Sequence, residues 1–230
     1  RLNFCHRNNM RADQESQVDE QTDLVRHAVV GEQYGGALLA VFGVGSRFWG
    51  SSSSIVHHSD SDLDLFLLYQ HPVPQGGVLL GSLDIGAAGV DGFLDAMAWG
   101  YPPYVSALLD GHVVWGNSQE IDGLKRDVRS WSLDQAAGCR LREQGRAFCG
   151  DADLVLQEAQ SGHCCRRFWT TVSFAISCLG LSDAIRIGET VSPTPHSALG
   201  EVMSGKYHRA LLLARRMKKR RSSIETMRAA

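Results

Sequence analysis

Two apolar runs joined by a serine-rich connection dominate the first third of the chain. Residues 37–44 are almost entirely apolar and end at Gly45-Ser46, which predicts a buried strand followed by a tight turn. Residues 62–68 are interpreted as strictly alternating, which is typical of a strand with one face buried. Further along, the pattern predicts a strand over 78–85, helices over 91–99 and 103–109, and a short strand over 111–116.

The pattern changes after residue 117, where period-2 alternation ends and helical spacing takes over. Helices are predicted over 132–158, with breaks at Gly145 and Gly150, and over 168–181, 196–203 and 206–221. An amphipathic helix over 19–33 precedes the first strand. We therefore expect a polar N-terminal tail over 1–18, an α/β (α+β) domain with a mixed sheet flanked by helices over 19–120, and an all-helical C-terminal bundle over 130–230.

The acidic residues of the second run are the first candidates for chemistry. Asp62 and Asp64 lie two residues apart, so a strand would place both carboxylates on one face, roughly 6–7 Å apart. Carboxylates this close repel each other, and a bound divalent cation removes that cost; their hard oxygen ligands suit Mg²⁺. Backbone N–H groups after Gly45 and the Ser46 hydroxyl are suited to a phosphate. A phosphate cradle facing paired carboxylates indicates phosphoryl or nucleotidyl transfer.

Gly45-Ser46 on one strand and Ser61-Asp62-Leu63-Asp64-Leu65 on the next resemble the signature of the polymerase-beta-type nucleotidyltransferase superfamily. The minimal nucleotidyltransferases and the aminoglycoside nucleotidyltransferases are its members nearest in size. The family fold has a mixed sheet, and in these enzymes a third carboxylate on the following strand completes a two-metal site. Asp84, between Leu83 and Ile85, matches that position.

The resemblance implies an enzyme that moves a nucleoside monophosphate to an acceptor hydroxyl. Asp62, Asp64 and Asp84 would hold two Mg²⁺ ions as catalytic residues, and Gly45, Ser46 and Arg47 would bind the nucleotide. ATP or another NTP is the expected substrate, and AMP the group transferred. The acceptor is a small molecule or a protein. An acidic general base in the helical half is also expected, with four candidates: Glu143, Asp151, Asp153 and Glu158.

Other interpretations of the same residues stay open. Fifteen residues separate Ser46 from Asp62, more than the family usually has, which favours a catalytically degenerate nucleotide-binding module or an antitoxin-like interaction module. The acidic residues also suit an exposed turn that caps an ordinary strand, and Asp84 suits a capped strand end. Arg47 is equally typical of a surface arginine. The basic residues of 206–221 are read as a solvated helix face rather than a nucleic-acid site.

Composition sets limits on the class of protein. With 230 residues and 43% apolar content, the chain can bury one large core or two modest ones. A net charge of −2 gives no general attraction to nucleic acid, so no nucleic-acid partner is expected. We expect no membrane span and no signal peptide, because no run of 18 apolar residues exists and the N-terminal residues are polar. The six cysteines lack zinc-ligand spacing and predict buried free thiols in a reducing cytoplasm.

Overall fold

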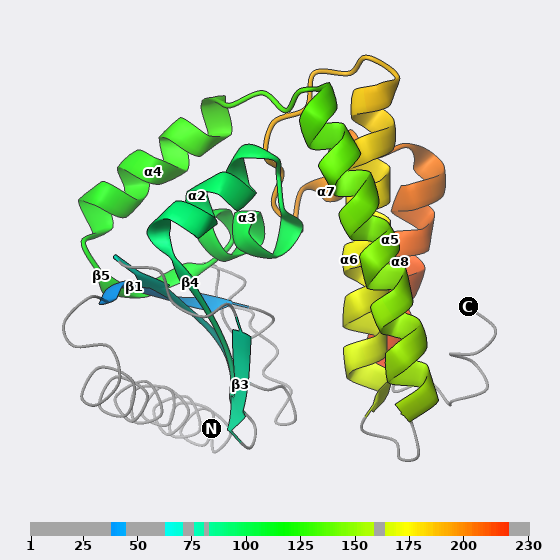
Figure 1. The fold of residues 1–230 in the computed structure, drawn as a ribbon, viewed down its shortest axis with the longest axis horizontal. Helices are drawn as coiled ribbons and strands as arrows, with labels where there is room; N and C mark the ends of the chain where they lie inside the picture. The colour runs from blue at the N-terminus through cyan, green and yellow to red at the C-terminus, as the bar shows by residue number, and fades with distance from the viewer. Residues whose placement is uncertain (1–37, 45–62, 71–75, 81–82, 159–163, 221–230) are drawn as a thin grey trace, which may run out of the picture.

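A mixed five-stranded sheet forms the core of the N-terminal half (Figure 1). The computed structural model describes residues 38–44, 63–70, 76–80, 83–158 and 164–220. The strands run in the order β3-β4-β2-β1-β5, with β4 parallel to β2 and every other neighbouring pair antiparallel. Their bounds are β1 (Leu38–Val44), β2 (Leu63–Tyr69), β3 (Gly76–Leu80), β4 (Leu83–Gly89) and β5 (His112–Gly116).

The predicted strands over 37–44 and 62–68 are confirmed as β1 and β2. Two details of the prediction are wrong. Residues 78–85 do not form one strand: the chain reverses between β3 and β4, which pair antiparallel. Gly81 and Ser82, two residues common in turns, stand between them. β2 does not have one buried face, because all residues from Leu65 to Tyr69 are buried. β2 has a neighbouring strand on each side and apolar core on each face. Its residues after Asp64 are therefore apolar on both faces and do not alternate with polar residues.

Three helices cover one face of the sheet: α2 (Val90–Ala98), α3 (Pro102–Leu109) and α4 (Ser118–Ser130). Their buried side chains form one cluster with strand residues such as Phe42, Phe66 and Ala88. Residues 117–130, where the sequence placed the boundary between domains, are the cap and the body of α4. Asn117 caps this helix, since its side-chain oxygen accepts hydrogen bonds from two backbone N–H groups of the first turn.

The remaining helices are α5 (Gln135–Glu158), α6 (Cys164–Arg186), α7 (Leu199–Val202) and α8 (Gly205–Arg220). α6 packs against both α5 and α8, and Figure 1 shows these three long helices standing beside the sheet and its covering helices. Leu141, Leu181 and Leu211, one from each, are fully buried in a shared cluster. Within the described residues, only 167–186 of α6 are long and apolar enough to cross a membrane, and 61% of that window is buried inside the structure.

The predicted breaks at Gly145 and Gly150 are wrong, because α5 is one continuous helix of 24 residues. At Gly145, a Cβ atom would stand 2.8 Å from Cγ of Leu179 and 3.2 Å from Cβ of Cys178, both on α6. This glycine therefore lets α5 approach α6 closely. At Gly150 a Cβ atom would meet nothing within 4 Å.

The two glycines give a matched pair of substitutions in one helix. Gly150→Ala should raise the free energy of unfolding by about 1 kcal/mol, the difference in helix propensity between the two residues. Gly145→Ala should lower it by about 1–3 kcal/mol, because α6 must move or repack around the added methyl group. Urea denaturation followed by circular dichroism measures both. Equal effects at the two positions would contradict the close packing of α5 on α6.

Candidate active site

Strand register brings the two described acidic candidates side by side. On the parallel pair β2–β4, Asp64 is the partner of Asp84. On the antiparallel pair β1–β2, Asp64 is the partner of Val44, the residue before Gly45 in the sequence. We call Asp84, Asp64 and Val44 the acidic row, since they occupy one cross-strand row on three adjacent strands. Neighbouring strands lie about 4.8 Å apart, so the row is a short one.

The acidic row lies on the face of the sheet that α2 and α3 cover. Residues in one row share a face, and residues two apart along a strand share it too. Phe66, two residues after Asp64, and Val44 both belong to the core cluster of that face. Asp64 itself is half-buried and comes directly before the fully buried part of β2. A carboxylate in this position is partly withdrawn from water, which increases its interaction with neighbouring charges.

The other predicted site residues, Gly45, Ser46, Arg47 and Asp62, lie outside the described residues. Their roles, and those of Asp64 and Asp84 as metal ligands, stay predictions. Within the described part of the chain, no group of three or more histidine, cysteine, aspartate or glutamate side chains is placed to hold a metal ion.

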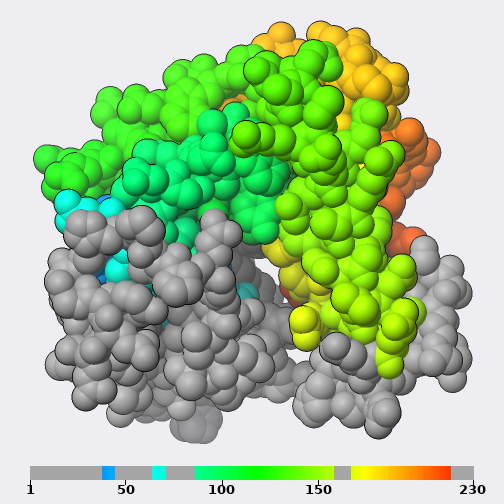
Figure 2. All heavy atoms as spheres, in the orientation of Figure 1, coloured from blue at the N-terminus to red at the C-terminus, as the bar shows by residue number. Residues whose placement is uncertain are grey.

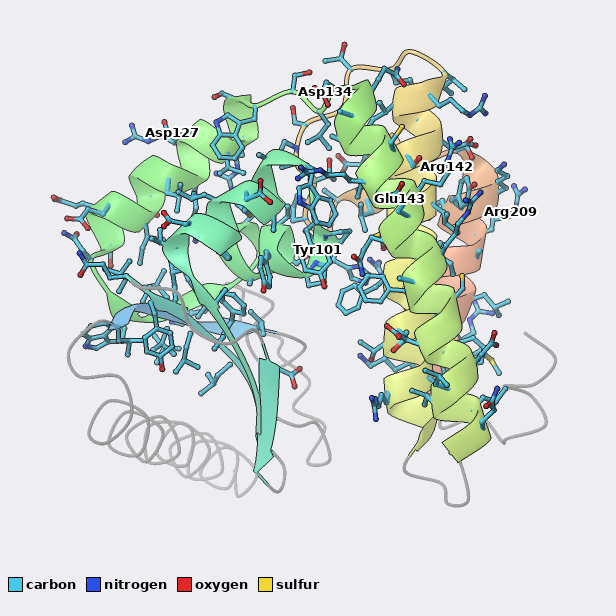
Figure 3. The ribbon with its side chains drawn as sticks, in the orientation of Figure 1. Tyr101, Asp127, Asp134, Arg142, Glu143 and Arg209 are labelled. Carbon is cyan, nitrogen blue, oxygen red and sulfur yellow. The ribbon has the colours of Figure 1, made fainter. Side chains whose placement is uncertain are left out.

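A set of half-buried aromatic side chains lies where α3 meets the long helices, and the sequence analysis did not identify it. We call it the aromatic wall. Tyr101, at the start of α3, is at its centre: ring centroids lie 5.1 Å away for Trp99, 4.9 Å for Tyr104 and 6.2 Å for Phe148 of α5. Phe174 of α6 extends it, 5.6 Å from Phe148. Figure 3 shows Tyr101 in the space between α3 and α5.

The run Trp99-Gly100-Tyr101-Pro102-Pro103-Tyr104 was the available sequence signal for three of the five residues of this wall. Gly100 permits the turn between α2 and α3, with a φ of 77°, and Pro102 begins α3. Three aromatic rings are thereby gathered around one short connection. The partners on α5 and α6 come from more than forty residues later, so no local pattern indicates them.

The Tyr101 hydroxyl is strongly perturbed. Burial raises its pKa well above the usual value, and nearby Tyr104, Cys178 and Asp151 raise it further. The phenol therefore stays protonated over the whole physiological range. Asp151, one of the four acids that the sequence left as candidate bases, is among the groups that raise this pKa. Glu143 and Asp153 are exposed residues of the same helix, α5.

A hydrogen-bonded clasp ties α3 to the helical half. Arg215 of α8 donates through Nε to Nε2 of His196, at 3.1 Å, and through a terminal nitrogen to the His196 carbonyl. The His196 N–H donates to Ser106 of α3, and Ser197 donates to the Asp110 carboxylate through its backbone N–H and its hydroxyl. His196 also packs edge-on against Phe174. The clasp therefore fixes the helical half beside the aromatic wall.

No protein-family model and no curated protein matches the chain. Among solved structures, the chain is similar to a nucleotidyltransferase-like protein from Exiguobacterium sibiricum 255-15, with a TM-score of 0.34 and 10% sequence identity. The similarity covers 81% of this chain and 70% of that chain. At this TM-score and identity it carries no argument for function, which must come from the residues themselves.

The clasp makes stability depend on pH. Burial, followed by the charges of Arg215 and Lys218, lowers the pKa of His196 from 6.5 to about 3. Below pH 6.5 the unfolded chain binds a proton there and the folded chain does not, so the free energy of unfolding falls as the pH falls toward 3. The contribution is on the order of 1 kcal/mol per pH unit over that window.

Urea midpoints measured from pH 7 to pH 4 for the parent and for His196→Gln test this dependence. The parent should lose stability more steeply than the variant, because glutamine takes up no proton. Parallel pH profiles would show that His196 is not held in its neutral form.

Proposed function

We propose that this chain is a metal-dependent nucleotidyltransferase that transfers a nucleoside monophosphate, AMP from ATP, to an acceptor hydroxyl. The register of the acidic row is the observation that supports the proposal most directly. It sets Asp64 beside Asp84 on one face of the sheet, with Val44, the residue that leads into Gly45-Ser46, on the next strand. An anion site and paired carboxylates at one end of three adjacent strands suit a nucleotide with its metal ions.

The carboxylate oxygens of the two aspartates in the row are suitable ligands for Mg²⁺. Carboxylate oxygens are the ligands that Mg²⁺ takes from proteins, usually one or two per ion together with substrate phosphates. Asp62, Asp64 and Asp84 would hold the ions, of which we expect two. When bound, such ions neutralise charge on the phosphates and lower the pKa of an attacking hydroxyl.

The chain's own residues have the tasks of binding and orientation. Backbone N–H groups after Gly45 and the Ser46 hydroxyl donate hydrogen bonds to the terminal phosphates of the nucleotide, and Arg47 adds a positive charge. Asp62, Asp64 and Asp84, through the ions that they would hold, would position the α-phosphate of the nucleotide at this end of the strands. Transfer then depends on alignment of the acceptor oxygen with the leaving pyrophosphate rather than on a covalent enzyme intermediate.

Substitution of the acidic row tests the proposal. Asp64→Asn and Asp84→Asn should each weaken Mg²⁺-dependent ATP binding by at least about tenfold, because even outer-shell partners of metal ligands contribute that much. Asp91→Asn is the matched control: this acid lies on the same half of the chain but is exposed in the first turn of α2. Isothermal titration calorimetry with and without Mg²⁺ measures the effect.

Incubation with ATP labelled on the α-phosphate, Mg²⁺ and a panel of hydroxyl-bearing small molecules and candidate proteins then tests for transfer. Label on an acceptor, lost in both asparagine variants, is the expected result. ATP binding without transfer to any acceptor would favour the nucleotide-binding module instead. Absence of ATP binding in the parent, or equal binding in parent and variants, would contradict the proposal.

A further inference from the structure

Half-buried aromatic residues gather in one place on this molecule. All five members of the aromatic wall, Trp99, Tyr101, Tyr104, Phe148 and Phe174, retain partial exposure, although they contact one another in a continuous series. By contrast, Phe42 and Phe93 in the adjacent core are fully buried. Adjoining aromatic rings that are only partly buried leave a continuous apolar surface, and ligand sites are lined mainly by apolar and aromatic side chains. Figure 2 shows the surface hollowed where α3 faces α5.

Ring contacts connect the wall to the acidic row. Phe66 follows Asp64 by two residues on the same face of β2, roughly 7 Å along the strand. Its ring centroid lies 5.1 Å from that of Tyr104, which in turn lies 4.9 Å from that of Tyr101. Two ring contacts therefore separate the strand that carries Asp64 from the centre of the wall. The wall and the acidic row therefore lie on the same side of the sheet.

The geometry of the rings suits a flat, uncharged partner. The rings of Tyr101 and Phe148 are parallel to within 6°, with centroids 6.2 Å apart, and they come from opposite sides of the junction between α3 and α5. This separation is near the long end of the range for stacked pairs, so the two rings gain little from each other. A heterocyclic base has a π-face that stacks on such rings whatever its hydrogen-bonding groups are.

We propose that the aromatic wall binds the base of the nucleotide, and that stacking on Tyr101 and Phe148 supplies the affinity for the nucleoside end. This inference rests on the proposed function, because a nucleotide must be the ligand of the acidic row. The aromatic wall would then bind the base, and the acidic row would bind the phosphates with their metal ions.

Comparison of ATP with inorganic tripolyphosphate isolates the base. Calorimetry with Mg²⁺ is carried out on the parent, Phe148→Leu and Tyr207→Leu. Tyr207 is the matched control, a half-buried aromatic residue of α8 that packs on the core of the helical half. Phe148→Leu should weaken ATP binding about fivefold or more, as expected for loss of stacking on one base, and leave tripolyphosphate binding unchanged. Tyr207→Leu should change neither affinity.

Unchanged ATP affinity in Phe148→Leu, or equal losses for ATP and tripolyphosphate, would overturn the inference. Fluorescence of the intact chain gives a second readout if the variant does not fold. The Trp99 ring lies 5.1 Å from Tyr101, so ATP should change its emission and tripolyphosphate should not, and Trp99→Phe identifies the signal. ATP that binds without any change in Trp99 emission would also overturn the inference.

The same measurements separate this inference from the proposed function. A parent that binds neither ATP nor tripolyphosphate contradicts the nucleotidyltransferase proposal. Adenosine then tests the wall alone: a change in Trp99 emission that Phe148→Leu weakens supports a base site, and no change rejects it.

Discussion

Two aspartates in one cross-strand row impose the constraint on which the account of this protein depends. Like charges opposite each other on neighbouring strands destabilise a sheet. Asp64 and Asp84 occupy such positions at the start of β2 and β4, on a face that is otherwise apolar core. A sheet designed only for stability would place neutral residues there. The proposed function accounts for acids in this row, because bound cations and a nucleotide would remove their repulsion.

The rest of the structure arranges partners around this row. α2 and α3 cover the same face and place Tyr104 beside Phe66, with Tyr101 next to Tyr104. The clasp between α3, His196 and Arg215 then holds α5 and α6 against the end of α3, so that Phe148 meets Tyr101. α3 thus connects the charged residues of the strands with the aromatic packing at the helix junction. This linkage explains why one short helix carries contacts to the sheet, to α6 and to the loop before α7.

Sequence patterns predicted the parts of this arrangement that depend on local periodicity. The strands over 37–44 and 62–68 and the helices over 91–99 and 103–109 were predicted because each carries its own apolar period. The pairing of the strands could not be predicted in the same way. Nothing in residues 78–85 indicates that they form a hairpin, or that its second strand pairs in parallel with β2. Gly145 was misread as a helix break because its reason, close contact with α6, involves residues more than thirty positions away. The aromatic wall was not predicted for the same reason, since its members on α5 and α6 are distant in the sequence from those beside α3.

A double-mutant cycle on the acidic row tests the central claim most directly. The free energy of unfolding is measured for the parent, Asp64→Asn, Asp84→Asn and the double variant, first with a chelator and then with Mg²⁺. Without metal, each single change should stabilise the chain, and the pair should show a repulsive coupling. With Mg²⁺ this coupling should vanish or change sign. Additive effects that are the same with and without Mg²⁺ would contradict the account.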